Sequence, residues 1–438
     1  MCKLPQRGPR WRRSDREVKD PAASRRGIEC RLTLLIISAA FNLSSSSLGR
    51  ILNEDVWTSP SLDEVKQDRQ APILFCPLQR LAIVLAFAQS VPRLFPERNI
   101  MRYQPTVSIV TIPDCAPLAK SVHSIMKAAG HDVRNNVIMV DTKVFADGNA
   151  LPKITMTVRR TEVYLFYAMP LGEPEKGIAR LAQILNAIHL GDPVLIKVVM
   201  PYFEGRQDRK DGARTPITAK VMARVIEGEE TVRGFVTFDL HADQLVLAFD
   251  HPVENLWGQK LLAQHARHSF GSSARVGVVA PDVGSSKRAE KFAEKSGFTL
   301  LGVIEKKRKR ANTVDSMRYI GDPVLDYHII LPDDLIDTGG TMVLAHKTIM
   351  AGGALSCSAY VTHWLASPKG DRDQPLYTAE AKFRDAGLSV VTTNTIPRSD
   401  DYWQKNCDIV SFVQCEGMLA DAIMRSLTPE ESVSELSE

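Results

Sequence analysis

The sequence lacks the cysteine pattern of a disulfide-bonded or zinc-binding protein. Its 438 residues include seven cysteines, which is an odd number, and no two of them form a Cys-x-x-Cys pair. Disulfide frameworks and structural zinc sites both depend on paired cysteines. We therefore expect neither, and a reducing compartment, with the cytoplasm as the default location.

The sequence also lacks a hydrophobic run long enough for a comfortable membrane span. Two apolar stretches, residues 32–43 and 81–91, lie behind an Arg-rich leader at residues 7–27 and are both short. A signal anchor or an organellar leader is one interpretation. We favour a poorly ordered extension over residues 1–102, not always translated because Met101 can serve as a start, since no clean cleavage signal is present. No membrane partner is expected.

A basic surplus is missing from most of the chain. The net charge is +4, but residues 1–100 carry 16 Lys and Arg against 10 Asp and Glu, so the rest carries 39 against 41. This balance gives no reason to expect that the folded part binds nucleic acid. The hydrophobic content of 44% is ordinary for a globular protein, and the length allows two or three domains.

Strand and helix patterns alternate from residue 103 onward, which indicates parallel sheets with helices on both faces. Before residue 256 we predict strands at 106–112, 162–168, 194–203 and 233–242, and helices at 118–130, 176–192 and 215–228. The third helix opens with Thr215 as its cap and Pro216 at its first position.

The same pattern restarts after residue 256. Strands are expected at 275–284, 299–305, 327–334, 356–364 and 389–395, and helices at 286–297, 342–353 and 378–387. We predict an α/β protein with two similar halves, residues 103–256 and 257–410. A last helix, residues 416–427, packs back on the first half, and residues 428–438 form a tail. No repeat is visible in the sequence itself.

The segment ILPDDLIDTGGTMVLAHK, residues 330–347, joins an acidic strand end to a Gly-Gly turn and a helix that starts at Thr341. The free N–H groups of residues 338–341 can converge on a phosphate, helped by the helix dipole. Asp333 and Asp334 lie far enough before them to meet the diol of a sugar, or a magnesium ion held by it. The segment predicts a sugar phosphate as ligand. A plain Asp-Gly-Gly turn is the alternative.

The motif DDLIDTGGT resembles the loop that binds phosphoribosyl pyrophosphate (PRPP) in type I phosphoribosyltransferases and in ribose-phosphate pyrophosphokinases. The resemblance implies that each half is a type I phosphoribosyltransferase-like domain. It does not by itself separate enzymes that consume PRPP from the one that makes it. The ribose 5-phosphate contacts that it implies are Asp333, Asp334, Asp337, Thr338, Gly339, Gly340 and Thr341, and a separate segment described below adds Asp282.

Residues 201–220, PYFEGRQDRKDGARTPITAK, resemble the ATP-binding segment of the ribose-phosphate pyrophosphokinase family. That segment carries Arg-Gln-Asp and then a stretch similar to Arg-x-Pro-Ile-Ser-Ala-Lys. A dense basic loop after a buried strand can clamp a polyphosphate. Taken alone, it is more often a solvated charge run. The matching positions are Arg206, Gln207, Asp208 and Arg214.

Residues 237–258, TFDLHADQLVLAFDHPVENLWG, are similar to the most specific segment of the same family. Asp239 and His241 have the period-two spacing of one side of a strand end. The family has further acidic residues here that are associated with Mg²⁺, a cation that prefers oxygen ligands. His241 would coordinate indirectly or hydrogen-bond the transferring group. The implied metal set is Asp239, His241, Asp250, Glu254 and Asp282.

Residues 278–297 resemble the family's strand–loop–helix, in which Asp282 faces ribose and a Lys-Arg pair begins the helix. GVIEKKRKRANTVD, residues 302–315, resembles the family's mobile catalytic loop. Its Lys-x-Arg pair falls on Lys306 and Arg308, which together with His241 are the implied catalytic residues. KKRKR alone would indicate a nuclear-localisation signal or a solvated run. By the same resemblance, His363 lies near ribose or nucleotide.

The segment FADGNALPKI, residues 145–154, departs from the family pattern. In many members this position, donated by a neighbouring subunit, recognises adenine. Phe145 can stack and Asp147 can accept a hydrogen bond, but Asn149 replaces a glutamate. Nucleotide choice or affinity is expected to differ for this reason.

The resemblance covers roughly residues 103–427 and implies the reaction of ATP with ribose 5-phosphate to give PRPP and AMP. It also implies Mg²⁺ as cofactor and a homo-oligomer, often a hexamer built from dimers. A non-catalytic regulatory subunit associated with PRPP synthetase is the alternative. A phosphoribosyltransferase would need only one such domain, and a nucleic-acid-binding protein rests on KKRKR and the basic leader alone.

Overall fold

The structure is a computed structural model that describes residues 106–436, apart from residues 207, 211, 213, 272–273, 308–315 and 368–376. The N-terminal extension expected over residues 1–102 therefore lies outside the described residues, and so do Gln207 and Arg308. None of the helices described in this part of the chain has the length and hydropathy that crossing a bilayer requires.

The first half forms a mostly parallel sheet of seven strands in the order β3-β2-β1-β4-β5-β6-β7. Only the pairing of β3 with β2 is antiparallel. The strands are β1 (Val107–Thr111), β2 (Ile138–Val144), β3 (Ala150–Ile154), β4 (Glu162–Phe166), β5 (Leu195–Val199), β6 (Val232–Phe238) and β7 (Val253–Leu256).

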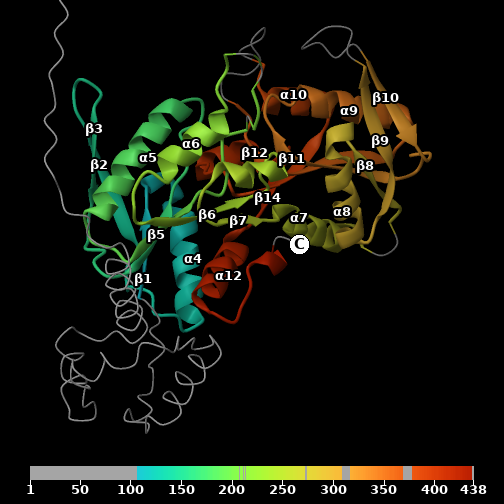
Figure 1. Ribbon diagram of the computed structural model, residues 1–438. Helices are drawn as coiled ribbons and strands as arrows, with labels where there is room; N and C mark the ends of the chain where they lie inside the picture. The colour runs from blue at the N-terminus through green and yellow to red at the C-terminus, as the bar shows by residue number, and fades with distance from the viewer. Residues whose placement is uncertain are drawn as a thin grey trace, which may run out of the picture. The chain divides into compact units, whose positions relative to one another are not determined.

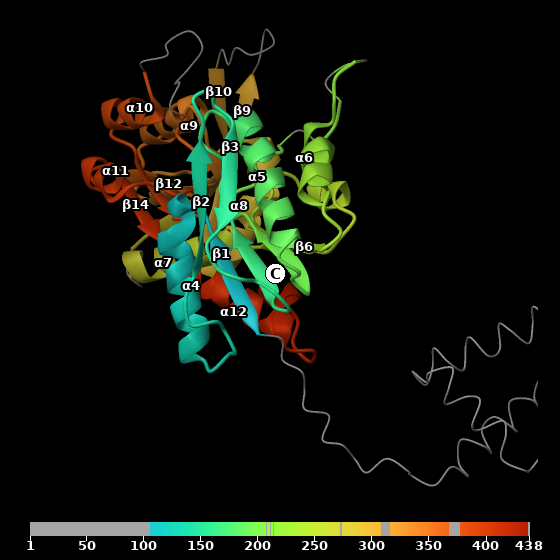
Figure 2. The same ribbon diagram turned by 90° about the vertical axis from the view of Figure 1, so that its left-hand side faces the viewer.

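Helices cover both faces of this sheet. Figure 2 shows α4 (Ala116–Ala128) and α5 (Pro174–His189) on opposite sides of it, and α6 (Thr218–Ile226) beside α5. The last helix, α12 (Glu416–Leu427), packs against α4 and buries Leu419 and Ile423 in the core of the first half. The helix α12, which follows the last strand of the second sheet in the sequence, therefore completes the hydrophobic core of the first half.

The second half repeats the strand order of the first as β10-β9-β8-β11-β12-β13-β14, again with one antiparallel pair, β10 with β9. This confirms the predicted fold class. The strands are β8 (Val276–Ala280), β9 (Thr299–Lys307), β10 (Ser316–Gly321), β11 (His328–Ile336), β12 (Ser356–Trp364), β13 (Ser389–Thr393) and β14 (Val410–Val413). The domain boundaries expected from the sequence stay predictions.

Two helix pairs enclose the second sheet, as Figure 1 shows. On one face lie α7 (Gly258–Phe270) and α8 (Ser286–Ser296), whose apolar residues pack on Ile330 and Tyr360. On the other lie α9 (Gly340–Ala351) and α10 (Ala379–Ala386), which pack on Leu331 and Val361. A short helix, α11 (Asp400–Lys405), precedes β14.

The predicted start of α6 is wrong. The helix begins at Thr218, with Ile217 in an extended conformation as its N-cap. The expected cap, Thr215, donates its hydroxyl back to the carbonyl oxygen of Gly212 at 3.1 Å. Because that hydroxyl is used in the preceding turn, it does not cap the helix.

The strand that carries the acidic pair is longer than predicted. β11 continues past Asp334 to Ile336, because its pairing with β12 extends to Ile336 opposite Trp364. Asp333 and Asp334 therefore lie inside a paired strand, which fixes their backbone. The strand order reverses between β8 and β11, and in α/β sheets ligands bind outside the carboxyl ends of strands at such a point.

Candidate active site

The turn between β11 and α9 has the backbone that a phosphate site requires. Gly339 is the N-cap of α9 and has φ +75, a left-handed conformation that favours glycine. A Cβ on Gly340 would meet nothing within 4 Å, so open space lies in front of the turn. The first N–H groups of an α-helix have no partner within the helix and can bind an anion.

A cavity of about 410 Å³ opens at this turn. It brings together the phosphate loop, the acidic pair of β11 and residues from three other segments. Its lining is His241, Asp282, Gly284, Ser285, Arg288, Lys306, Asp333, Asp334, Leu335, Ile336, Asp337, Thr338, Gly339, Gly340, Thr341 and Met342. All eight ribose 5-phosphate residues expected from the sequence are in this lining, together with Lys306 and His241.

The acidic pair is held by two basic side chains from different elements. His241 Nδ1 lies 2.6 Å from Asp334 Oδ2. Arg288 Nη1 lies 3.2 Å from Asp333 Oδ1 and 3.6 Å from Asp334 Oδ1. Burial alone would raise the pKa of Asp334, but the hydrogen bond from His241 and the charge of Arg288 hold that pKa well below its usual range. Asp334 is therefore an anchored carboxylate.

The side chain of Lys306 lies in the cavity. The expected catalytic loop continues into residues 308–315, which lie outside the described residues. The Nζ of Lys306 lies 2.5 Å from Asp282 Oδ2, and both side chains are mostly buried. Burial would raise the pKa of Asp282, but the hydrogen bond and charge of Lys306 outweigh it and lower that pKa. Asp282 Oδ1 also accepts the backbone N–H of Ser285 at 2.9 Å. The ion pair thus holds the ammonium group of Lys306 in the cavity that Asp333 and Asp334 also line.

The loop after β5 reaches the phosphate loop. Arg206 Nη2 lies 3.2 Å from Asp337 Oδ2, and the hydroxyl of Ser367 donates to the other oxygen of Asp337. Lys382 also contacts this loop, since its Nζ donates to the carbonyl oxygen of Thr338 at 2.9 Å. The expected ATP segment and the expected phosphate loop are therefore in direct contact.

Asp239 points into the junction of the two halves and does not line the cavity. The hydroxyl of Thr362 and the backbone N–H of Gln259, the latter at 3.1 Å, donate to its carboxylate. Burial raises its pKa to about 6. Gln259 also donates its side-chain amide to the carbonyl oxygen of Asp333. Asp239 thus fixes the start of α7. In the sequence, Asp239 lies two residues before His241.

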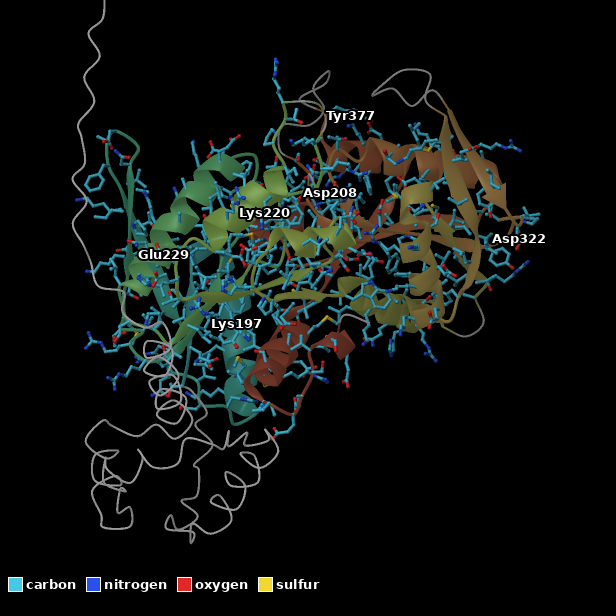
Figure 3. All side chains as sticks on the ribbon, in the orientation of Figure 1. Lys197, Asp208, Lys220, Glu229, Asp322 and Tyr377 are labelled. Carbon is cyan, nitrogen blue, oxygen red and sulfur yellow. The ribbon has the colours of Figure 1, made fainter. Side chains whose placement is uncertain are left out.

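The predicted metal set is brought together only in part, because His241 and Asp282 line the cavity and the other three members do not. Asp250 pairs with Lys220, labelled in Figure 3, at 3.2 Å. Glu254 lies on β7 opposite Val236, and it lines another cavity with Lys197. Because Glu254 pairs with Val236, it lies before the carboxyl end of β6, which is at Phe238. Within the described residues, no group of three or more His, Cys, Asp or Glu is arranged to hold a metal ion.

Neither Arg206 nor the other described ATP-site residues line the cavity. Phe145 and Asp147 lie in the turn between β2 and β3, where Phe145 is 42% exposed and Asp147 accepts hydrogen bonds from Asn149 at 2.7 and 3.0 Å. Asp208, labelled in Figure 3, pairs with Arg209 at 3.0 Å. Arg214 is exposed. An adenine site built from Phe145 and Asp147 needs a second chain or a movement of this hairpin.

His363 joins the two halves rather than lining the cavity, contrary to expectation. Its Nε2 lies 3.1 Å from the carbonyl oxygen of Phe238, and its Nδ1 lies 2.9 Å from Thr395 Oγ1. The ring is 1% exposed, and burial lowers its pKa to about 4. It is therefore a neutral structural histidine that links β12 to the end of β6.

We expect His363 to make the protein less stable in mild acid. The pKa of His363 is lower in the folded state than its usual value of about 6.5. At a pH between these two values, His363 is protonated in the unfolded state and neutral in the folded state, so acid favours unfolding. The free energy of unfolding falls by about 2 kcal/mol from this group between pH 7 and pH 4.5. Urea unfolding of the wild type and His363→Gln at both pH values measures it. A variant with the wild-type pH dependence would contradict this role.

Sequence comparison places these features among known enzymes. Residues 107–229 match the family described as the N-terminal domain of ribose phosphate pyrophosphokinase. A ribose-phosphate pyrophosphokinase of Caulobacter vibrioides is 34% identical over 293 residues, which cover 67% of this chain and 89% of that protein. The chain belongs to the ribose-phosphate pyrophosphokinase family.

Other ribose-phosphate pyrophosphokinases give the same result. That of Xylella fastidiosa is 34% identical over 349 residues, covering 79% of this chain and 99% of that protein. The crystal structure of phosphoribosylpyrophosphate synthetase from Mycobacterium smegmatis aligns with a TM-score of 0.63 at 26% identity, covering 73% of this chain and 98% of that one. These relatives carry the names of enzymes, pyrophosphokinase or synthetase. This favours a catalytic chain over the alternative of a non-catalytic regulatory subunit.

Several residues of this pyrophosphokinase site could not be assigned from the sequence. Arg288 was visible only as part of a Lys-Arg pair at a helix start, with no indication that it reaches two carboxylates on β11. Gln259, Ser367 and Lys382 carried no signal, because each acts through one contact that only the tertiary structure creates.

Proposed function

We propose that the protein transfers the β,γ-diphosphoryl group of ATP to the 1-hydroxyl of ribose 5-phosphate, giving PRPP and AMP. One observation carries this proposal: a single cavity joins a phosphate loop, two carboxylates and a lysine. The loop suits the 5-phosphate, the carboxylates suit the ribose hydroxyls, and the lysine suits a transferring phosphoryl group.

The 5-phosphate would bind the amides of residues 338–341, at the start of α9. The ribose would then extend along β11 toward Asp333, with its anomeric carbon directed to Lys306 and Asp282. Ribose O1 attacks the β-phosphorus of ATP, so the O1–P bond forms while the bond from that phosphorus to the α,β-bridging oxygen breaks. AMP leaves with the bridging oxygen, and the hydroxyl proton is lost to solvent.

The side chains of the cavity mainly position the reactants and neutralise charge. Lys306 can stabilise the negative charge that develops on the transferred phosphoryl oxygens. Arg206, which touches Asp337, lies where it can bind the polyphosphate of ATP. Such contacts contribute most when they are made in the transition state and not in the ground state.

Mg²⁺ is part of this proposal. When bound, it neutralises phosphate charge and orients the β-phosphorus. Asp282 fits as its ligand, because its carboxylate lines the cavity and Mg²⁺ in nucleotide sites takes one or two carboxylates together with phosphate oxygens. Asp250 and Glu254 do not fit, because they do not line the cavity.

A homo-oligomer also belongs to the proposal. Phe145 and Asp147 do not line the cavity of their own chain, as expected if the turn between β2 and β3 completes the adenine site of a neighbouring subunit. Exposed Val144 and Leu151 flank this turn and are available for such a contact.

Incubation of the purified full-length chain with Mg²⁺, ATP and ribose 5-phosphate tests the reaction. We expect AMP and PRPP in equal amounts, with no AMP when ribose 5-phosphate is omitted. Quantitative chromatography of both products measures this. Formation of ADP in place of AMP, or no turnover, would contradict the proposed function.

A further inference from the structure

Arg288 lies between the two carboxylates of β11. It is the third residue of α8, and its side chain is 21% exposed. A single nitrogen, Nη1, lies 3.2 Å from Asp333 Oδ1 and 3.6 Å from Asp334 Oδ1. One guanidinium therefore serves two neighbouring acids.

The two acids depend on Arg288 to different degrees. Asp334 has a second partner, because His241 Nδ1 lies 2.6 Å from it. For Asp333, no ion pair other than that with Arg288 is formed within the described part of the chain. Burial, the charge of Asp334 and a hydrogen bond between the two carboxyl groups raise the pKa of Asp333 well above its usual range, and the charge of Arg288 opposes this rise. Arg288 is therefore the group that favours a negative charge on Asp333.

The hydrogen bonds of Asp333 leave one oxygen for a ligand. Oδ1 accepts the backbone N–H of Asp334 at 3.0 Å and contacts Arg288. No N–H or hydroxyl of the described residues donates to Oδ2, and Asp333 lines the cavity. Two contacts on Oδ1 thus fix the carboxylate and leave Oδ2 to accept a hydrogen bond.

We propose that Arg288 is a positioning residue that makes this site select a ribose over a 2-deoxyribose. It holds Asp333 so that Oδ2 accepts a hydrogen bond from the 2-hydroxyl of the sugar phosphate. Of the two acids, Asp333 lies farther along β11 from the phosphate loop, and C2 of the sugar is farther from the 5-phosphate than C3. The inference rests on the proposed function of the cavity as a ribose 5-phosphate site.

A purely structural role for Arg288 predicts something different. If the guanidinium only neutralised a buried pair, its loss would weaken ribose 5-phosphate and 2-deoxyribose 5-phosphate by the same factor. If it positions Asp333, its loss weakens only the sugar that carries the 2-hydroxyl. The ratio of the two dissociation constants separates these roles, because general damage to the cavity cancels in it.

Calorimetric titration of the full-length chain with each sugar phosphate measures this ratio. The wild type is expected to bind ribose 5-phosphate about 10- to 100-fold more tightly, because the sugar without the 2-hydroxyl leaves a buried polar group of the site without its partner. In Arg288→Gln the ratio falls to within about threefold of one. Lys287→Ala, an exposed neighbour on the same helix, keeps the wild-type ratio. A wild-type ratio in Arg288→Gln would overturn the proposal.

A second variant keeps the test decisive if Arg288→Gln does not fold. Asp333→Asn retains the pairing of Arg288 with Asp334 and is expected to lose the same discrimination. A wild-type ratio in this variant would also overturn the proposal.

The wild type alone separates failure of the proposed function from failure of this inference. A wild type that binds ribose 5-phosphate selectively but makes no PRPP contradicts the proposed function alone. One that makes PRPP without sugar selectivity contradicts this inference alone, and one that binds neither sugar contradicts both.

Discussion

Replacing Lys306 by alanine is expected to lower kcat for PRPP formation by about 10²–10³ while changing the KM values little. The ammonium group lines the cavity, 2.5 Å from Asp282, and it is the one lysine of the lining among the residues that the structure describes. In the proposed reaction, Lys306 stabilises the negative charge that develops on the transferring phosphoryl group, and neither substrate carries this charge on its own. Steady-state rates with both substrates varied measure this effect.

Two further variants show whether the effect belongs to this lysine. Lys347→Ala removes a positive charge from the exposed face of α9 and should leave kcat within about twofold. Lys306→Arg keeps the charge but alters its geometry, so we expect partial activity. A Lys306→Ala variant with raised KM for ATP and normal kcat would show that Lys306 binds ATP in the ground state and does not stabilise the transition state.

The fold, and the gathering of the acidic pair and the Gly-Gly turn at one cavity, were predictable because their signals are local. An acidic pair, a Gly-Gly turn and a helix in one continuous stretch place Asp333 and residues 338–341 at one strand end, whatever the rest of the chain does. The hydrophobic strands β11 and β12 were visible for the same reason. Strands such as β3, with Pro152, and β7, with only four residues, have weak patterns, because edge strands need little hydrophobic alternation.

The metal set that the family resemblance implied stays a prediction, and the structure separates three of its acids. Asp239, Asp250 and Glu254 lie within sixteen residues of one another, but a 3-10 helix at Asp243–Ala248 and the register of β7 separate them. Asp239 is then used at the junction between the halves, where Thr362 and Gln259 donate to it. Which carboxylates face a cavity is decided by strand register and by partners distant in sequence.

Replacing Gly339 by alanine is expected to raise the dissociation constant for ribose 5-phosphate by about tenfold or more. A Cβ there would lie 3.0 Å from Phe383 Cε2, on a residue with φ +75. The backbone must change to relieve both problems, and a non-glycine residue in this conformation costs roughly 1–3 kcal/mol. Because Gly339 is the N-cap of α9, that change moves the amides that hold the 5-phosphate in the proposed complex.

The matched control for this variant is Gly387→Ala. Gly387 has a similar φ of +66 at the end of α10, and a Cβ there would meet nothing within 4 Å. It should lose stability through backbone strain without loss of ribose 5-phosphate affinity. Thermal unfolding and calorimetric binding of both variants separate strain from phosphate binding. If both variants bind ribose 5-phosphate equally well, the N-terminus of α9 does not bind the 5-phosphate. The strain at Gly339 would then have changed the backbone there without affecting any group that the ligand contacts.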